Sequence, residues 1–490
     1  MDIEITDLTY RYGEEQKPVL DNVSLTIPGG EWILLSGLSG SGKTTLAYAM
    51  AGILFHQQSG LYQGQVKIGE QPVEQMTLYQ VADKVGFVQQ NADDQFCTLN
   101  VAEELGFGLE NKCIPLDEMK QRMDWALRTT MAESLLDRSL LELSGGEKQK
   151  IAIASILALQ PAILILDEPT SNLDVESTRM VFKVLQDLRQ KKNITVILIE
   201  HKVNYFAPLF DRCVFLNEGR ITFDGETKNS PLFLSEKQKV ETQDRKITPK
   251  KQARLSLRDW NYANGNGFHL NMPEITLHEG EVIALMGPNG SGKTTFMKTI
   301  CGMLKPTSGT LIHEGNEVTS VDPRQCSFVF QDADDQLFMN SVVDEIQYGL
   351  VNFQCLDDAH LEKMDSLIES LKLQLRRTTN PHRLSYGEKK RLNLAAELVY
   401  DPVILLLDEI FIGQDIYQVQ FIVKQIRELS NQGLTIIAAM HDLSLVPVLA
   451  DRVLFLENGC LQFDLPPSMA VEWWHSHDYT DYTSSGGIWL

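Results

Sequence analysis

The chain carries one glycine-rich sequence twice, and this repeat limits the folds that it can adopt. Residues 33–45 read ILLSGLSGSGKTT, and residues 283–295 read IALMGPNGSGKTT, 250 positions later. VGFVQQNADDQ, LSGGEK and ILILDE then recur as SFVFQDADDQ, LSYGEK and ILLLDE at an offset of 241, and a histidine recurs at an offset of 240. Solenoid repeats are much shorter, about 20 to 50 residues. The order of these pairs therefore predicts a duplicated domain of roughly 240 residues.

The repeat and the composition between its copies predict four segments. They are a first domain over 1–235, a linker over 236–254, a second domain over 255–467 and an aromatic tail over 468–490. Between Lys237 and Arg254 the linker holds seven basic residues and two acidic ones. This composition predicts a solvated linker, and a basic contact to lipid or a partner is the alternative. The tail contains three of the six Trp, with His475 and His477. It is predicted to be a docked or frayed end, with metal binding as the alternative.

Short apolar runs alternate with helical patterns in each half. Continuous apolar stretches cover Glu31 to Ser36, Ala162 to Leu166 and Val196 to Ile199. Continuous apolarity predicts strands that are buried on both faces of a parallel sheet. Regular alternation of such strands with helices predicts an α/β fold. Each half is therefore expected to be an α/β domain with a mainly parallel core sheet.

The composition excludes several classes of protein. Hydrophobic residues make up 43% of the chain and charged residues 22%, which is typical of globular domains rather than disordered or fibrous ones. No stretch reaches the roughly 18 apolar residues of a membrane-spanning helix, and the first residues predict no secretory signal. Seven scattered Cys without a C-x-x-C spacing favour reduced thiols over disulfides or a zinc site. The net charge of −22 argues against nucleic acid as a partner.

Both glycine-rich sequences fit the pattern G-x-x-x-x-G-K-[ST] between a strand and a helix. In this context the backbone N–H groups cradle phosphates, the Lys binds the β- and γ-phosphates and the hydroxyl binds Mg²⁺. A glycine turn beside a surface Lys is the alternative, which two matches in the right context disfavour. The predicted phosphate-binding residues are Gly37, Leu38, Ser39, Gly40, Ser41, Gly42, Lys43, Thr44 and Thr45, and then Gly287, Pro288, Asn289, Gly290, Ser291, Gly292, Lys293, Thr294 and Thr295.

An Asp-Glu pair ends an apolar strand in each half. A carboxylate at this place can hold Mg²⁺, and the adjacent Glu can orient and deprotonate an attacking water. Glu168 and Glu409 are therefore predicted to be the catalytic bases. Strand-end acids that only face solvent are the alternative, which the repeated spacing after a phosphate loop disfavours. The predicted Mg²⁺ ligands are Asp167, Asp408, Thr44, Thr294, Gln90 and Gln331.

Two further motifs recur at matched spacings. Ser144 with Gly146, and Ser385 with Gly387, begin helical patterns where free N–H groups make a second anion site. An ordinary Ser N-cap is the alternative. His201 and His441 each follow an apolar strand and are predicted to sense the γ-phosphate. A satisfied buried histidine is the alternative there.

This set of motifs, in this order, resembles the nucleotide-binding domains of ATP-binding cassette (ABC) ATPases, twice over nearly the whole chain. The resemblance includes Ser171-Asn-Leu-Asp174 and an aromatic residue that stacks on adenine. Tyr12 and Tyr262 stand at that place, 31 residues before each loop Lys, and Tyr10 and Trp260 are nearby rivals. The resemblance implies tandem P-loop domains, each with a mainly parallel core sheet and a helical signature subdomain, and it implies ATP and Mg²⁺ as ligands. It also implies head-to-tail closure, in which Lys43 faces Ser385 and Lys293 faces Ser144.

The stretches QNADDQF, QDADDQLF, EELGFGLEN and DEIQYGLVN resemble the energy-coupling-factor (ECF) importers of vitamins and metals. The resemblance implies an integral membrane coupling protein and a membrane substrate-binding protein as partners, at the cytoplasmic face of the cell membrane. The layout is similar to fused ATPases for hydroxymethylpyrimidine (HMP) or thiamine uptake. Four carboxylates that follow Gln90 and Gln331 are expected to contact coupling helices that carry Arg, and a merely solvated loop is the alternative. They are Asp93, Asp94, Asp334 and Asp335.

Two other function classes fit parts of the sequence. A fused sugar or nucleoside importer ATPase has a similar size, and a soluble ribosome-associated tandem ABC protein has a similar motif order. The short linker and acidic balance argue against the second. The second half also departs from the family pattern: LSYGE carries Tyr386 in place of a glycine, and DEIFIGQD stands where the family usually has DEPTSGLD. These departures predict two sites of unequal activity.

Overall fold

The computed structural model describes residues 1–490 except 14–16, 58–59, 171–172, 174, 192–193, 201–202, 232–251, 266, 413, 415 and 478–490. The chain divides into two compact units between Lys239 and Val240. The predicted linker lies mostly outside the described residues. Strand β11 begins at Ala253.

The first unit is built on a six-stranded sheet with the order β10-β9-β3-β8-β7-β6. Five neighbouring strands are parallel, and only the edge strand β10 is antiparallel to its neighbour. Every residue of β3, β7 and β8 is buried, as the continuous apolar runs predict. The strands are β3 (Trp32–Gly37), β6 (Val85–Val88), β7 (Ile163–Asp167), β8 (Thr195–Ile199), β9 (Arg212–Asn217) and β10 (Arg220–Glu226).

A second sheet of four antiparallel strands lies in the same unit, in the order β2-β1-β4-β5. Its buried residues join one hydrophobic cluster with residues of β3, β7 and β8 and of helix α1, so the two sheets share a core. The strands are β1 (Ile3–Arg11), β2 (Leu20–Ile27), β4 (Leu61–Ile68) and β5 (Gln71–Pro72). The helices are α1 (Lys43–Met50), α2 (Ile53–His56), α3 (Leu78–Ala82), α4 (Val101–Asn111), α5 (Leu116–Thr130), α6 (Gly145–Ala158), α7 (Val175–Lys191) and α8 (Val203–Phe206).

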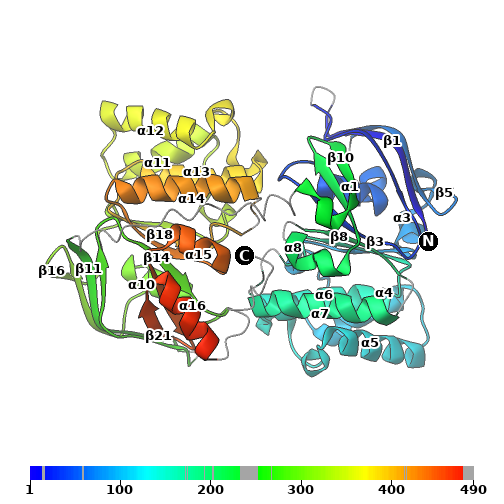
Figure 1. Ribbon diagram of the computed structural model, residues 1–490, viewed down its shortest axis with the longest axis horizontal. Helices are drawn as coiled ribbons and strands as arrows, with labels where there is room; N and C mark the ends of the chain where they lie inside the picture. Colours follow the sequence, from blue (N-terminus) through cyan, green and yellow to red (C-terminus); the bar gives the residue numbers. More distant parts are fainter. Residues whose placement is uncertain are drawn as a thin grey trace. The chain divides into compact units, whose positions relative to one another are not determined.

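The second unit repeats this plan in a single sheet of eleven strands (Figure 1). Its core order β20-β14-β19-β18-β17 repeats β9-β3-β8-β7-β6. The strands are β11 (Ala253–Ala263), β12 (His269–Met272), β13 (Ile275–His278), β14 (Val282–Met286), β15 (Ser308–His313), β16 (Asn316–Val318), β17 (Cys326–Val329), β18 (Ile404–Asp408), β19 (Thr435–Ala439), β20 (Arg452–Glu457) and β21 (Cys460–Leu465). The helices are α10 (Lys293–Ile300), α11 (Val342–Asn352), α12 (Asp358–Ser370), α13 (Tyr386–Leu398), α14 (Ile416–Asn431), α15 (Val446–Leu449) and α16 (Pro467–Ser476).

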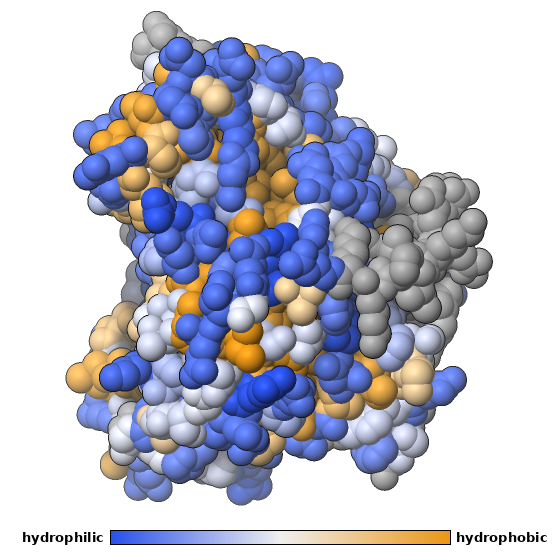
Figure 2. Space-filling model, turned by 90° about the vertical axis from the view of Figure 1, so that its left-hand side faces the viewer, coloured by the Kyte–Doolittle hydropathy of each residue, from blue (hydrophilic) through white to orange (hydrophobic). Residues whose placement is uncertain are grey.

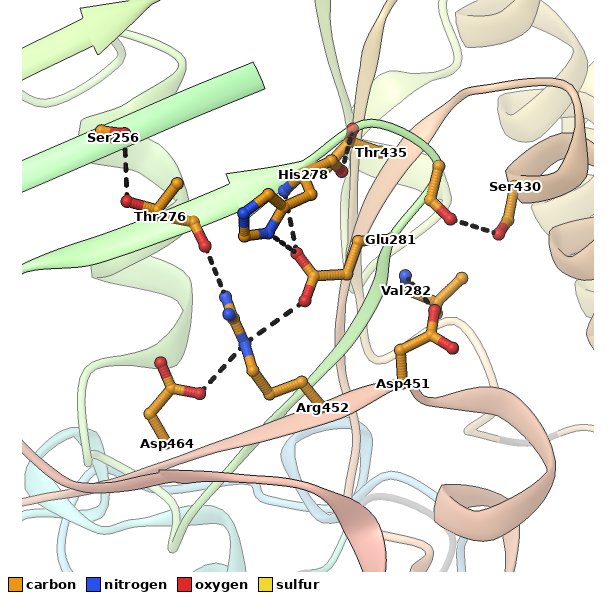
Figure 3. Close-up of polar contacts among 11 residues, drawn as sticks. Ser256, Thr276, His278, Glu281, Val282, Ser430, Thr435, Asp451, Arg452 and Asp464 are labelled. Atoms are coloured by element: carbon orange, nitrogen blue, oxygen red, sulfur yellow. Dashed lines mark hydrogen bonds and ion pairs between the residues drawn. The ribbon is translucent and has the colours of Figure 1, made fainter. Parts of the chain in front are cut away.

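An arginine at the start of β20 connects β13 to the hairpin β20–β21 through a hydrogen bond and ion pairs. Figure 3 shows the Arg452 guanidinium between two carboxylates, 3.4 Å from Glu281 and 3.0 Å from Asp464. Arg452 also donates to the carbonyl oxygen of Thr276 at 2.8 Å. Arg212 makes the equivalent contacts in the first unit. The repeated cluster is therefore part of the framework of each unit, and its charges are engaged in structural ion pairs.

Part of the predicted aromatic tail is a helix that packs on the second unit. Trp474 of α16 is fully buried, and its ring lies against Phe455 and Phe463 of the hairpin β20–β21. His477 stacks on Trp473 with ring centroids 4.1 Å apart. The docked part of the tail therefore adds to the hydrophobic core. The side chain of His475 lies outside the described residues, as do residues 478–490.

Within the described part of the chain, no helix is long and apolar enough to cross a membrane. The face shown in Figure 2 carries mostly hydrophilic side chains, with hydrophobic ones in separate groups between them. Scattered apolar groups of this kind are normal on a folded domain.

Candidate phosphate-binding and catalytic site

Both glycine-rich loops run from a buried strand into a helix, as the motif requires. A side-chain carbon at Gly37 would lie 2.1 Å from the carbonyl oxygen of Leu216, and one at Gly287 would lie 2.0 Å from that of Leu456. These positions exclude any side chain. Gly42 and Gly292 have φ values of 101° and 102°, which suit glycine, and α1 and α10 begin directly after them. The loops therefore present helix N-termini at the ends of β3 and β14.

The two loop lysines are buried, each with about 5% of its surface exposed. Lys43 Nζ donates to the carbonyl oxygens of Gly37 and Leu38 at 3.1 Å each. Lys293 Nζ donates to those of Gly287 and Pro288 at 2.8 and 3.1 Å. The ammonium groups thus lie inside their loops, where N–H groups and positive charge converge.

Further loop residues support an anion site. The Ser41 and Ser291 hydroxyls are buried without a hydrogen-bond partner among the described residues. Added side-chain carbons at Gly40 and Gly290 would meet no atom within 4 Å, so these loop tips border open space. Of the other predicted phosphate-binding residues, Ser39 and Asn289 lie in the loops, and Thr44, Thr45, Thr294 and Thr295 lie in the first turns of α1 and α10.

Glu409 follows β18 and lies in the left-handed region at φ 50°, a costly conformation for a residue with a side chain. Its carboxylate accepts from Gln331 Nε2 at 2.6 Å and lies 2.7 Å from His441 Nε2. Burial alone would raise the pKa of Glu409, but the hydrogen bond and charge of His441 and two nearby lysine ammonium groups lower it below its ordinary value. An ionised carboxylate in this place has the protonation state of a general base.

Asp408 fits the chemistry of a magnesium ligand. Its Oδ2 accepts from Thr294 Oγ1 at 2.7 Å, and its buried Oδ1 has no hydrogen-bond partner among the described residues. Burial raises the pKa of Asp408 above its ordinary value despite that hydrogen bond. Mg²⁺ prefers oxygen ligands of this kind beside phosphate groups. Asp408 and Thr294 would hold the ion, with Gln331 beside them.

The first unit places its equivalent residues in the same way. Glu168 has φ 44° after β7, and its Oε2 accepts from Gln90 Nε2 at 3.3 Å. Lys43 Nζ lies 3.9 Å from Glu168 Oε1. Asp167 is buried at the end of the same strand. The predicted His201 and the motif residues Ser171, Asn172 and Asp174 lie outside the described residues.

Ser144 and Ser385 cap α6 and α13, which we name the signature helices. Each serine forms a capping box with the Glu three positions later. The N-cap interpretation therefore holds for both, and an N-cap leaves other N–H groups of the first turn without intrahelical partners, which an anion can use. Gly146 and Gly387 pack closely, because added side-chain carbons would lie 2.2 Å from Ser177 Oγ and 2.9 Å from Gln414 Oε1.

The structure explains how Tyr386 replaces a glycine. An added side-chain carbon at the equivalent Gly145 would meet no atom within 4 Å, and neither position has a positive φ. Position 386 is ordinary helix, so a tyrosine there meets no backbone conflict. The Tyr386 hydroxyl donates to the carbonyl oxygen of Gln331 at 3.4 Å. Any effect of Tyr386 must come from its side chain.

The second departure, DEIFIGQD, is accompanied by a change in the residue that its Phe411 packs near. In the first unit the Thr170 hydroxyl donates to the buried Glu200 carboxylate at 2.5 Å. At the equivalent places the second unit has Phe411 and Met440, which belong to one hydrophobic cluster. A polar pair has been exchanged for an apolar pair. The change therefore preserves packing behind the strand end that carries Glu409.

Tyr12 and Tyr262, the residues predicted to stack on adenine, are more exposed than the alternatives Tyr10 and Trp260. Tyr10 and Trp260 are buried core residues, with at most 1% of their surface exposed. Tyr12 is 40% exposed, and its hydroxyl lies 3.1 Å from Thr45 Oγ1 at the start of α1. Tyr262 is half-buried. Tyr12 thus lies beside the phosphate loop with an accessible ring, as adenine stacking requires.

Sequence reasoning missed three buried charged residues. Glu104 and Glu345 lie in the first turns of α4 and α11 and accept hydrogen bonds from the backbone of 97–98 and 338–339. Lys390 on α13 is fully buried, and burial lowers its pKa to about 8 against the opposing effect of nearby carboxylates. The signal available for Lys390 was its repeat partner, which is the uncharged Gln149.

The comparisons with known proteins agree with the geometry. A family model described as ABC transporter matches residues 20–171 and 270–411. A protein of Methanosarcina mazei with the provisional name ABC transporter ATP-binding protein is 31% identical over 95% of this chain and 89% of its own. A Bacillus subtilis protein, provisionally named HMP/thiamine import ATP-binding protein YkoD, is 31% identical over 95% of this chain and 92% of its own.

A solved structure titled as ribosome-bound archaeal Pelota and ABCE1 shares the fold of the whole chain. Its TM-score is 0.70 with 21% identity, covering 96% of this chain and 80% of that chain. The tandem fold and the two family matches thus coincide with the two phosphate loops and their Asp-Glu pairs. The chain therefore belongs to the ABC transporter family of ATP-binding proteins and is an ATPase with two ATP-binding domains.

Proposed function

We propose that this ATPase is the energy-coupling subunit of an ECF-type membrane importer, with HMP or thiamine as the favoured cargo. The observation that carries the proposal is the whole-chain relation to the Bacillus subtilis import ATPase, including both domains. The repeated ADDQ segments support the ECF type. The partners would be an integral membrane coupling protein and a membrane substrate-binding protein, which would hold the chain at the cytoplasmic face of the membrane.

The residues of the second unit suggest how hydrolysis proceeds. Glu409 accepts the proton of the attacking water, and His441 and Gln331 hold its carboxylate in place. Lys293 and the loop N–H groups stabilise the charge that develops on the transferred phosphoryl group. Asp408 and Thr294 would hold Mg²⁺, which would supply positive charge beside the β- and γ-phosphates. Glu168, Lys43 and Asp167 would do the same work in the first unit. The head-to-tail contribution of Ser144 and Ser385 stays a prediction.

Uptake of labelled compounds tests the proposed cargo. Cells that express the chain with its native membrane partners should accumulate HMP or thiamine, and Glu409→Gln should remove this uptake. Labelled sugars and nucleosides serve as the comparison. Uptake of those compounds instead would support the fused sugar or nucleoside importer.

The structure sharpens the proposed membrane contact. Asp93 is paired with Lys148 at 2.7 Å, and Asp334 with Lys389 at 2.7 Å. Both lysines belong to the signature helices, so these two carboxylates have internal roles. Asp94 and Asp335 are exposed, and the described residues give their side chains no hydrogen bond or ion pair. We propose that this second pair receives Arg side chains of the membrane coupling protein.

Asp94→Lys with Asp335→Lys should release the chain from membranes and leave basal ATP hydrolysis unchanged, because the charge reversal repels a basic partner. Co-expression with the membrane partners followed by fractionation measures the effect. The matched control is Glu70→Lys with Glu317→Lys, which reverses two exposed carboxylates outside the ADDQ segments. Normal membrane retention of the Asp94/Asp335 variant would remove the docking assignment and leave the ATPase assignment intact.

The two sites should be unequal. By resemblance, the Lys43 site receives the LSYGE segment, and the Tyr386 side chain should slow it. Glu409→Gln should therefore lower turnover at least several-fold more than Glu168→Gln. Steady-state phosphate release by the two purified single variants measures this difference. Equal losses would contradict the asymmetry.

A further inference from the structure

One face of helix α13 is bonded to the loop that precedes α11. Four side chains at spacings of four, three and four residues lie on the same side of the helix. All four reach the segment 330–336, which we name the second Q-loop. They are Tyr386, Lys390, Asn393 and Glu397, and together they form the polar stripe of α13.

The contacts of the stripe run along the whole loop. Tyr386 and Lys390 both donate to the carbonyl oxygen of Gln331, and Lys390 also donates to that of Phe330 at 3.1 Å. Further along the helix, Asn393 Nδ2 donates to the carbonyl oxygen of Ala333 at 3.0 Å. Glu397 Oε1 accepts from Gln336 Nε2 at 3.3 Å.

Two members of the stripe are almost completely buried. Lys390 has no exposed surface and Asn393 only 2%. A buried ammonium group has lost its water, so its hydrogen bonds to the loop carbonyls are costly to break. The loop and the helix should therefore separate only with a large loss of favourable contacts.

The first unit lacks this stripe. At the equivalent places α6 has Gly145, Gln149, Ala152 and Ile156. Gln149 Nε2 is buried without a hydrogen-bond partner among the described residues. The equivalent loop, 89–95, keeps contacts with α6 through Lys148–Asp93 and through Gln95 Nε2 to the Ala152 carbonyl oxygen at 3.1 Å. The added polar bonds are thus particular to the second unit.

The polar stripe is connected to the candidate base Glu409 through Gln331. Gln331, whose carbonyl oxygen receives Lys390 and Tyr386, donates through its side chain to Glu409 at 2.6 Å. We propose that the polar stripe is a set of positioning residues that holds Gln331 against Glu409. Helix α13 and the second Q-loop then move together, whereas α6 and the equivalent loop 89–95 move more independently. The effect on turnover rests on the proposed function of Glu409, but the mechanical coupling does not.

Lys390→Gln in the full chain tests this coupling, because Gln is the residue that the first unit carries and the fold accepts there. Amide hydrogen exchange in peptides covering 330–337 should accelerate about tenfold, as loss of a hydrogen bond from a charged donor predicts. Peptides covering 89–96 should not change. The matched control, Gln149→Ala, should leave both regions unchanged.

Turnover supplies a second measurement. Lys390→Gln should lower kcat on the order of tenfold, within the roughly hundredfold that a 1 Å misplacement costs, and should leave KM for ATP within about twofold. Unchanged exchange at 330–337, or equal exchange changes in both loops, would overturn the coupling. Unchanged kcat with accelerated exchange would overturn the positioning role. Full turnover by Glu409→Gln would instead contradict the proposed function of Glu409.

Discussion

Replacing Lys43 and Lys293 together by alanine is expected to abolish measurable ATP hydrolysis. Each amine lies inside its loop and would meet the charge that develops on the transferred phosphoryl group. Loss of one donor of this kind costs on the order of 10² to 10³ in kcat. Phosphate release with Mg²⁺ and ATP measures the loss in the double variant and in each single variant.

Lys305→Ala removes an exposed amine from the same second unit and is the control. It should keep the parental rate. Thermal unfolding of the double variant must accompany the assay, because each buried lysine also bonds two loop carbonyls. A folded double variant with parental turnover would contradict the phosphate-binding assignment.

Glu168→Gln with Glu409→Gln is expected to separate ATP binding from hydrolysis. An amide keeps the size of the carboxylate but cannot accept the proton of the attacking water. The double variant should therefore bind ATP with near-parental affinity and release phosphate at least about 10²-fold more slowly. Retention of labelled ATP on a filter and phosphate release, measured on the same preparation, give the two quantities. Parental hydrolysis would show that neither residue is the base.

The parallel core was predictable because its strands are continuous apolar runs. Trp32–Gly37, Ile163–Asp167 and Thr195–Ile199 form where the sequence indicates them. The antiparallel sheet of the first unit was not predicted, because its strands lack the continuous apolar runs that mark the core. Their buried and exposed residues alternate, or most of their residues are exposed. In β4, the first four residues are exposed, Leu61 and Tyr62 among them, and only Val66 and Ile68 are buried. Such a strand is stabilised by its partners more than by its own pattern.

The phosphate loops and Asp-Glu pairs were predictable because their chemistry depends on short, local spacings. The polar stripe was not, because Lys390 and Asn393 acquire their roles only from the loop that packs against α13. Tyr386 shows the same limit. The sequence shows only that a tyrosine stands in place of a glycine, whereas the structure shows ordinary helix there and a hydrogen bond from the hydroxyl to the carbonyl oxygen of Gln331. Local motifs identify reacting groups, but the contacts that hold those groups depend on tertiary packing.

The first half has Thr170 and Glu200 where the second half has Phe411 and Met440, and this difference limits which segments could be recombined between the two halves. A recombination that copied only the strand-end segment of the second half into the first would set a phenylalanine beside Glu200. That buried carboxylate would lose its hydroxyl donor, at a cost of about 1 to 3 kcal/mol. The reverse copy would place a threonine hydroxyl in an apolar cluster. The residues at 170 and 200, and those at 411 and 440, are therefore matched pairs, and only exchanges that carry both positions would keep each contact intact.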